Sequence, residues 1–336
     1  MKAMILTNIQ PIEKEPLILK EILTPLPAKD EIRIKIYACG ICHTDLHIIE
    51  GDLPLPKLPL IPGHQIVGVV EKVGENVSKF REGDRVGVPW LSSTCQRCEF
   101  CQRGKENLCD EARFTGYHTD GGYAQYMVIS EDFAYHIPDD VSDFEIAPLL
   151  CGGVIGYRAL RLTEIKPGDR LGLYGFGASA HIVIQIARHR GCKVFVFTRS
   201  EAHRALARNL GAVWTGKAED ELPEKMHGSI IFAPAGHLVP EALRVLQKGG
   251  TLALAGIYMT PIPEIEYSSL LYHERTVRSV ANSTRQDVRD LLKLAGEIPL
   301  RTQVQVFPLE EANKALQLLK RSRIQASAGV LEIPQE

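Results

Sequence analysis

Alternating apolar and charged residues mark the first strand that the chain predicts. Residues 31–39 read EIRIKIYAC, in which Ile32, Ile34 and Ile36 fall on one face and the charged residues take the positions between them. This period of two is typical of a half-buried strand. Similar apolar runs, bounded by glycine turns, predict three more strands at 65–73, 85–88 and 123–129. The opening region is therefore predicted to be mostly β.

A different pattern begins near residue 166, where short apolar runs alternate with stretches of helical period. The predicted strands are 171–174, 193–197, 230–233, 251–255 and 276–280. The predicted helices between them are 178–190, 201–210 and 240–247. This alternation predicts an α/β domain with a doubly wound, Rossmann-type parallel sheet. Two amphipathic helices at 286–295 and 309–320 and a strand at 329–333 follow, and we expect them to pack back on the first domain.

The length of the chain predicts two domains. With 336 residues it exceeds what one hydrophobic core usually holds, and 45% hydrophobic content is enough for two cores. We place one domain at 1–153 together with 283–336, carrying a small lobe at about 90–112. The second domain is placed at 154–282.

Charge and hydropathy exclude several classes of partner. The net charge is −2 and no basic run occurs, which argues against nucleic acid as a partner. No stretch of about 18 uninterrupted apolar residues is present, so no membrane span is expected. The N-terminus lacks the pattern of a signal peptide, and a cytoplasmic location is expected. The eight cysteines are therefore interpreted as metal ligands or buried thiols rather than disulfides.

The segment 40–47, GICHTDLH, holds the densest group of reactive side chains. Cys42 offers a thiolate, and Thr44 and His47 lie three residues apart on a short helix that Thr44 is predicted to cap and Gly51 to end. A hydroxyl beside an imidazole provides a path for a proton. A lone cysteine or histidine is more often a core or surface residue, so a zinc site here requires two further ligands.

Four cysteines follow in a charged loop with little apolar periodicity. They are spaced C-x2-C-x2-C-x7-C, at Cys95, Cys98, Cys101 and Cys109. Such a lobe has little core of its own, and a structural zinc held by four thiolates would keep it closed. Reduced surface cysteines or disulfides are the alternative, which the regular spacing disfavours.

A glycine-rich loop between a predicted strand and a predicted helix indicates a dinucleotide. Residues 175–180, GFGASA, fit G-x-G-x-x-A. Gly175 permits a tight turn, Gly177 lets the backbone approach a pyrophosphate, and Ala180 keeps the helix close to the strand, while Phe176 and Ala178 complete the turn.

The end of the next strand bears on which dinucleotide is used. It carries Thr198, Arg199 and Ser200, with no carboxylate to accept the adenosine 2′-hydroxyl of NAD(H). Arg199, with His203 or Arg204, provides a partner for a 2′-phosphate. We therefore favour NADP(H) over NAD(H); the alternative is that Arg199 is solvated or stacks on the adenine.

With these motifs in this order, the chain resembles the zinc-dependent medium-chain alcohol dehydrogenases over essentially its full length. The resemblance implies a GroES-like catalytic domain interrupted by a Rossmann domain, and two zinc ions per chain. It assigns a catalytic zinc to Cys42, His64 and Cys151, with a fourth position open to water or substrate, and a structural zinc to the four-cysteine lobe. Such a catalytic ligand set leaves zinc able to polarise an alcohol oxygen while hydride passes to the nicotinamide.

The resemblance also implies roles for the neighbouring residues. The proton leaves through Thr44, the cofactor ribose and His47. His43 and Arg285 match positions that contact the pyrophosphate. Asp45 matches the carboxylate that orients the zinc-binding imidazole. Alternatively, His43 or Asp45 only caps the helix.

Two positions bear on reactivity and substrate. The family usually has Glu after the liganding histidine, whereas this chain has Gln65. The missing charge predicts a more electrophilic metal and slower ligand exchange. Trp90 resembles the bulky aromatic that narrows the pocket in ethanol-type members, which favours small primary alcohols; a core aromatic is the alternative.

The resulting interpretation is an alcohol dehydrogenase or aldehyde reductase acting on small alcohols. A polyol or cinnamyl-type dehydrogenase on the same scaffold, or a non-catalytic NAD(P)-binding relative, are the alternatives. By resemblance we expect a homodimer or homotetramer formed through the edge of the Rossmann sheet.

Overall fold

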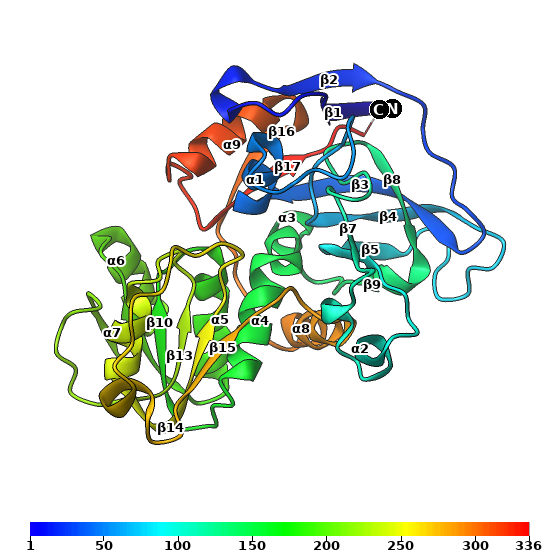
Figure 1. The fold of residues 1–336 in the computed structure, drawn as a ribbon. Coiled ribbons are helices and arrows are strands. Elements are labelled where there is room, and N and C mark those ends of the chain that lie inside the picture. Colours follow the sequence, from blue (N-terminus) through cyan, green and yellow to red (C-terminus); the bar gives the residue numbers. More distant parts are fainter. Residues whose placement is uncertain (336) are drawn as a thin grey trace. The chain divides into compact units, whose positions relative to one another are not determined.

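The computed structural model describes residues 1–335 and divides into two compact units (Figure 1). The first unit comprises Met1–Cys151 and Thr284–Glu336, and the second comprises Gly152–Ser283. The sequence analysis placed these boundaries at 153/154 and 282/283.

A seven-stranded sheet forms the centre of the first unit. Its strand order is β16-β17-β3-β4-β5-β9, with β8 also paired to β3. The strands are β3 (Glu31–Ile41), β4 (Ile66–Val73), β5 (Arg85–Val88), β8 (Tyr126–Ser130), β9 (Tyr135–His136), β16 (Val304–Pro308) and β17 (Ala328–Glu332). Ile32, Ile34 and Ile36 are fully buried, which explains the alternation along β3. The strand extends two residues beyond the predicted end, to Ile41.

Shorter elements complete the first unit. They are the hairpin β1 (Lys2–Leu6) and β2 (Leu17–Glu21), the pair β6 (Leu91–Ser93) and β7 (Arg113–Phe114), and the helices α1 (His43–Glu50), α2 (Glu99–Gln102), α3 (Asp143–Ile146), α8 (Arg285–Glu297) and α9 (Ala312–Lys320). The sequence analysis did not predict the hairpin. α8 begins with a capping box between Thr284 and Asp287, which satisfies the first backbone donors of the helix.

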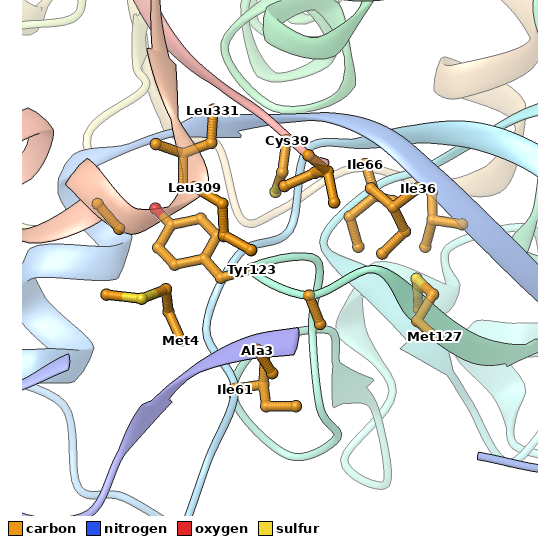
Figure 2. Packing of buried hydrophobic residues seen from close by; sticks show 14 of the residues in the cluster. Ala3, Met4, Ile36, Cys39, Ile61, Ile66, Tyr123, Met127, Leu309 and Leu331 are labelled. Carbon is orange, nitrogen blue, oxygen red and sulfur yellow. The ribbon is translucent and has the colours of Figure 1, made fainter. Parts of the chain in front are cut away.

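The core of this unit joins segments that lie far apart in the chain. Figure 2 shows Met4 of β1, Cys39 of β3 and Leu331 of β17 packed around the ring of Tyr123. Burial of each such side chain stabilises the fold by roughly 1.5–3 kcal/mol. The core therefore holds the first and last strands of the chain on the same scaffold as β3.

The second unit is a six-stranded parallel sheet in the order β12-β11-β10-β13-β14-β15. The strands are β10 (Arg170–Tyr174), β11 (Lys193–Phe197), β12 (Trp214–Gly216), β13 (Met226–Ile231), β14 (Leu246–Leu254) and β15 (Thr276–Ser279), and the helices are α4 (Gly152–Leu162), α5 (Ala178–His189), α6 (Glu201–Asn209) and α7 (Leu238–Arg244). Counted along the chain, this is the order 3-2-1-4-5-6 of a dinucleotide-binding sheet. The prediction of a doubly wound sheet is confirmed.

Several predicted boundaries in this unit were wrong. The helix expected at 240–247 ends at Arg244, and β14 begins at Leu246 instead of 251. Gly249 has a φ of +72° and the pairing of β13 with β14 shifts register here, so the glycines form an irregularity inside the strand rather than a helix stop. α4 was not predicted. Among the described residues, none of the helices has the length and apolarity needed to cross a bilayer.

Candidate active site

β3 delivers Cys42 to the start of α1, where the reactive segment folds into a compact turn. The Asp45 carboxylate accepts the backbone N–H of Cys42 at 2.8 Å, and Gly51, at a φ of +83°, ends the helix. The N-cap is therefore Cys42, and the prediction that Thr44 caps this helix was wrong. Asp45 reaches back to the N-cap from the third helical position, which is the arrangement that satisfies an orphan donor.

Three side chains from distant segments converge beside this turn. The ligand atoms of Cys42, His64 and Cys151 all lie within 4.8 Å of one another. The two sulfurs are 3.9 Å apart. His64 precedes β4, and Cys151 follows a 3₁₀ helix at Ala147–Leu150. Two thiolates and one imidazole form a ligand set that suits zinc and leaves a fourth position open.

The environment of His64 fits a metal ion. Its ring is fully buried, and Nδ1 lies 3.1 Å from the Asp45 carboxylate. Its other nitrogen, Nε2, is buried and has no hydrogen-bond partner within residues 1–335. A buried polar atom without a partner is costly, so a missing ligand is expected at Nε2. Metal-binding histidines typically donate their second ring nitrogen to a carboxylate in this way.

The protonation states of the metal-free site follow from its crowding. Burial opposes a charge on His64, but Asp45 and Cys42 outweigh it and raise the pKa of the ring to about 10. The hydrogen bond from Cys151 holds the pKa of the Cys42 thiol well below its usual value. The pKa of Cys151 is raised well above normal, first by its bond to Cys42 and then by burial. These shifts follow from the short distances between the three side chains.

α1 places the predicted proton path beside these ligands. The Thr44 hydroxyl lies 3.6 Å from the Cys42 sulfur and is buried. One turn later, His47 Nδ1 lies 2.8 Å from a carboxylate oxygen of Asp52. His43, the predicted pyrophosphate contact, is exposed. Sequence reasoning missed Asp52, which follows the helix-ending glycine and belongs to no motif.

Gln65 and Trp90 both adjoin the liganding histidine. Gln65 is buried, and its side chain packs over Gly40, where an added Cβ would lie 2.8 Å from its Oε1. The Trp90 ring meets the His64 ring edge-on at 4.8 Å. It also stacks with Phe114 and Tyr117, at 5.0 and 5.8 Å between ring centroids. Trp90 thus belongs to an aromatic cluster that adjoins the site, and its substrate role stays a prediction.

The four cysteines of the lobe come together as a second group. Their sulfur atoms all lie within 4.8 Å of one another. Cys95 Sγ accepts the backbone N–H of Cys98 at 3.3 Å, and Cys109 Sγ accepts that of Cys95 at 3.5 Å. Hydrogen bonds lower the pKa of the Cys95 thiol to about 6, and the bond from the Arg97 backbone has the largest effect. All eight cysteines are free, so this cluster fits a closed four-thiolate metal site.

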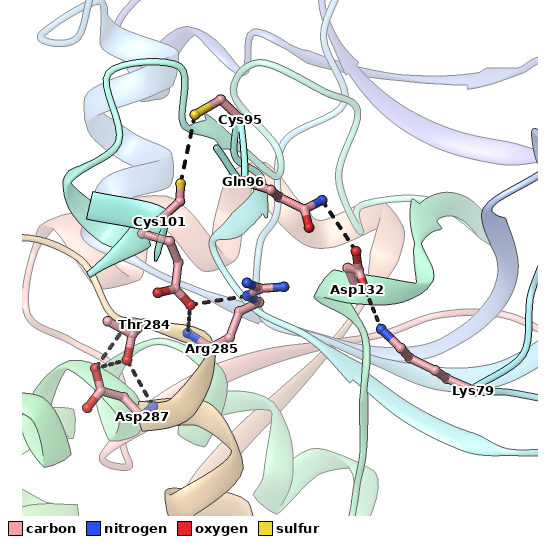
Figure 3. A network of polar contacts seen from close by, with 9 residues as sticks. Lys79, Cys95, Gln96, Cys101, Asp132, Thr284, Arg285 and Asp287 are labelled. Carbon is pink, nitrogen blue, oxygen red and sulfur yellow. Dashed lines mark hydrogen bonds and ion pairs between the residues drawn. The ribbon is translucent and has the colours of Figure 1, made fainter. Parts of the chain in front are cut away.

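Arg285 lies beside this lobe, at the start of α8 (Figure 3). Its backbone N–H and its Nε both donate to one oxygen of Glu106, at 3.0 and 3.1 Å. The guanidinium also lies over the Phe133 ring at 5.3 Å. The Glu106 carboxylate is almost wholly buried. The structure thus gives Arg285 a local partner that the sequence did not predict, and its predicted contact with a pyrophosphate stays untested.

The glycine-rich loop of the second unit has the expected backbone. Gly175 follows β10 with a φ of +87°, and Gly177 is the N-cap of α5. Phe176 and Ala180 are buried, whereas a Cβ built on Gly177 would meet no atom within 4 Å from the described residues other than its own chain neighbours and helix backbone. The fold alone therefore does not require glycine at 177. A pyrophosphate approaching the backbone at the N-terminus of the helix would require it, so the loop fits a dinucleotide. Ala178 is the first residue of α5.

The loop after β11, at residues 198–200, contains no carboxylate. Thr198 is held by its backbone to Gly216, and Ser200 caps α6 by accepting the N–H of His203. Arg199 is exposed and forms no ion pair with the other described residues. Arg204 donates from Nε to the Thr198 carbonyl at 2.9 Å. The adjacent Glu201 is bound by Arg204 and Arg208, so its charge is compensated.

Known proteins match the chain over most of its length. Residues 28–139 match the alcohol dehydrogenase GroES-like domain, and residues 180–297 match the zinc-binding dehydrogenase family. A probable alcohol dehydrogenase, AdhA, of Mycobacterium tuberculosis (strain CDC 1551 / Oshkosh) is 45% identical over 326 residues, which cover 96% of this chain and 94% of that protein. An alcohol dehydrogenase of Geobacillus stearothermophilus is 38% identical over 320 residues, covering 93% and 95%.

Solved structures agree with this assignment. The cinnamyl alcohol dehydrogenase SbCAD4 of Sorghum bicolor has a TM-score of 0.89 at 28% identity, covering 98% of this chain and 97% of that one. The predicted combination of a GroES-like domain with a Rossmann-type sheet is confirmed. On these matches the chain is an oxidoreductase that belongs to the zinc-dependent medium-chain alcohol dehydrogenase family.

Proposed function

We propose that this dehydrogenase transfers hydride between a small primary alcohol, or its aldehyde, and NADP(H), with one catalytic and one structural zinc per chain. The observation that carries the proposal is the convergence of Cys42, His64 and Cys151 around the unpartnered Nε2 of His64. A purely structural cluster would be expected to satisfy that nitrogen.

The residues of the first unit have separate roles in the proposed reaction. Cys42, His64 and Cys151 would hold the zinc, which when bound supplies a Lewis acid that polarises the alcohol oxygen. Asp45 fixes the ring of His64 through Nδ1. The Thr44 hydroxyl beside Cys42 accepts the proton of the substrate and passes it toward His47. Asp52 lies 2.8 Å from His47 Nδ1 and so orients the imidazole that receives this proton.

The cofactor proposal rests on the second unit. The Gly175–Gly177 turn and the N-terminus of α5 would hold the pyrophosphate. Arg199 is exposed at the end of β11 with no carboxylate in the Thr198–Ser200 loop, which favours a 2′-phosphate and hence NADP(H). Steady-state rates with the two cofactors at equal concentration test this. A preference for NADP(H) that falls in Arg199→Ala supports it, and a clear preference for NAD(H) contradicts it.

The substrate proposal rests on Trp90. Its ring lies against His64 and adjoins Phe114 and Tyr117, so it would limit the space beside the metal. The same aromatic cluster favours cinnamyl-type alcohols as a second candidate, since aromatic rings pack well on one another. Turnover of a panel running from ethanol to hexanol, with cinnamyl alcohol and sorbitol, separates the candidates. Trp90→Ala should improve the longer alcohols relative to ethanol; an unchanged chain-length profile contradicts the pocket assignment.

We also propose that the protein assembles as a homodimer or homotetramer through the edge of the Rossmann sheet. β15 is the last strand of that sheet, and strand edges are templates for pairing. Exposed apolar side chains gather in the segment before it: Ile257, Tyr258, Ile262, Tyr267 and Tyr272. A cytoplasmic location stays a prediction.

A further inference from the structure

The carboxylate of Asp45 is fully buried and accepts three hydrogen bonds. One oxygen, Oδ1, accepts from His64 Nδ1 at 3.1 Å. The other, Oδ2, accepts the backbone N–H of Cys42 at 2.8 Å and the hydroxyl of Tyr123 at 3.1 Å. The first two partners belong to the proposed metal ligands. The third comes from a residue 78 positions away, to which no motif gives a role.

The surroundings of Tyr123 direct its hydroxyl to Asp45. The side chain is fully buried among apolar residues, with Met4, Cys39 and Leu331 around the ring (Figure 2). Asp45 is the hydrogen-bond partner of its hydroxyl. Burial, and after it the charge of Asp45, raise the pKa of Tyr123 well above its usual value. The hydroxyl therefore stays protonated and donates a hydrogen bond to the Asp45 carboxylate.

The same tyrosine packs against the backbone that carries His64. Three hydrogen bonds join residues 121–123 to residues 61–63: Gly121 N to Ile61 O at 2.7 Å, Gly122 N to Gly63 O at 3.0 Å and Tyr123 N to Pro62 O at 3.0 Å. Gly63 has a φ of +96°, and a Cβ there would lie 2.4 Å from Cδ1 of the Tyr123 ring. The ring thus occupies the space beside the residue that precedes His64.

We propose that Tyr123 is a positioning residue for the metal ligand His64. Its ring fixes the turn at Gly63, and its hydroxyl fixes the orientation of the Asp45 carboxylate. Together they hold the imidazole so that Nε2 points to the place where Cys42 and Cys151 converge. The inference rests on the proposed function, because it requires a metal ion at these three residues.

Loss of the hydroxyl should loosen the ligand without disturbing the core. Tyr123→Phe keeps the ring against Gly63 and removes only the bond to Asp45. A single neutral-to-charged hydrogen bond makes a modest net contribution, so we expect the catalytic zinc to leave roughly 2- to 10-fold faster. The hydrogen bonds of the four-cysteine site join its cysteines to one another and do not involve Tyr123, so its zinc should leave at the rate of the wild type.

The experiment follows zinc release from the holoenzyme into a chromogenic chelator, together with the visible spectrum of the cobalt-substituted protein. Tyr135→Phe is the matched control, since it removes a hydroxyl from a ring of the same unit that is 5% exposed and lies beside Arg289. We expect Tyr123→Phe to accelerate release of the one zinc whose loss abolishes turnover and to shift the cobalt bands. Tyr135→Phe should do neither.

Three results would overturn the inference: release and cobalt spectra identical to those of the wild type, equal acceleration of both zinc ions, or failure of Tyr123→Phe to fold. The last two would mean that the hydroxyl supports the whole unit rather than the metal site. A wild-type protein that binds no metal at Cys42, His64 and Cys151 is a different outcome, because it contradicts the proposed function itself.

Discussion

At the scale of single residues, the surroundings of His64 decide what its imidazole can do. One nitrogen is committed to Asp45 and the other is buried without a partner. A buried imidazole with one free nitrogen is prepared for a metal, because the cost of removing that nitrogen from water is recovered only when a ligand arrives. Gln65, the next residue, leaves this environment without the carboxylate that the family usually has there.

The charge of residue 65 should shift the acidic limb of the pH dependence of kcat/KM. Gln65 is 4% exposed, so a carboxylate introduced by Gln65→Glu would act through little solvent. A negative charge favours the protonated form of nearby groups, and the lower apparent pKa of kcat/KM should therefore rise, with activity lost at a higher pH than in the wild type. Gln65→Met, which is neutral and similar in length, controls for loss of the amide. An unchanged profile in Gln65→Glu would count against the idea.

At the scale of elements, the four-cysteine lobe depends on contacts from distant segments. Cys95 and Cys109 lie in loops and Cys101 lies in the short helix α2, while Glu106 binds Arg285, the first residue of α8 (Figure 3). Lys79 and Gln96 add a polar link, since both contact the Asp132 carboxylate. We predict that a bound metal, together with the Glu106–Arg285 pair, takes the place of a hydrophobic core in this lobe.

The Glu106–Arg285 contact should contribute to stability. Glu106→Gln keeps the size of the side chain and an acceptor oxygen but removes the charge, and it should lower the free energy of unfolding by about 1–3 kcal/mol, because the hydrogen bonds from Arg285 lose their charged acceptor. Thermal unfolding with both metals present measures the effect. Glu99→Gln is the control, since its pair with Arg103 is exposed, and it should change stability by less than about 0.5 kcal/mol.

An unchanged melting temperature in Glu106→Gln would mean that this pair does not support the lobe. A raised KM for the nicotinamide cofactor in Arg285→Met, without loss of stability, would instead favour the predicted role of Arg285 at the pyrophosphate. The two readouts therefore separate a structural role from a cofactor role.

Elements and sites with local signals in the sequence could be predicted, whereas those that depend on contacts between distant segments could not. β3, the four-cysteine cluster and the Gly175 turn have local signals, namely alternation, spacing and a glycine at positive φ, and all three could be predicted. The polar start of β13 at His227–Ser229 concealed the first residues of this strand, which was predicted at 230–233, and the two glycines that open α4 concealed that helix. Tyr123 could not be assigned, because its hydroxyl acquires meaning only when the fold brings it to Asp45.

The convergence of Cys42, His64 and Cys151 could be predicted only by resemblance. The two cysteines are 109 positions apart, and no local pattern in the chain indicates that they meet. Their approach depends on the core that joins β3 to the segments around Gly63 and Cys151. Such long-range contacts are determined by the packing of the fold, and the hydrophobic periodicity of the sequence does not reveal them.

At the scale of the whole molecule, the exposed edge of the second unit predicts assembly. Ile262→Asp places a charge among the exposed apolar residues before β15 and should release subunits of 37.3 kDa from the dimer or tetramer. Light scattering after size-exclusion chromatography measures the mass. Leu23→Asp, at a side chain of the first unit that is 93% exposed, should leave the assembly intact. A wild-type protein that is already monomeric would contradict the proposed interface.

Metal content and turnover, measured together on purified protein, test the account most directly. We predict two zinc ions per chain by mass spectrometry and NADP-linked oxidation of small alcohols, and we predict that Cys42→Ser keeps the lobe zinc while losing the other ion and the activity. A wild-type chain without zinc in the Cys42 site, or a Cys42→Ser variant that retains two ions and full turnover, would contradict the central claim that Cys42, His64 and Cys151 form the catalytic metal site.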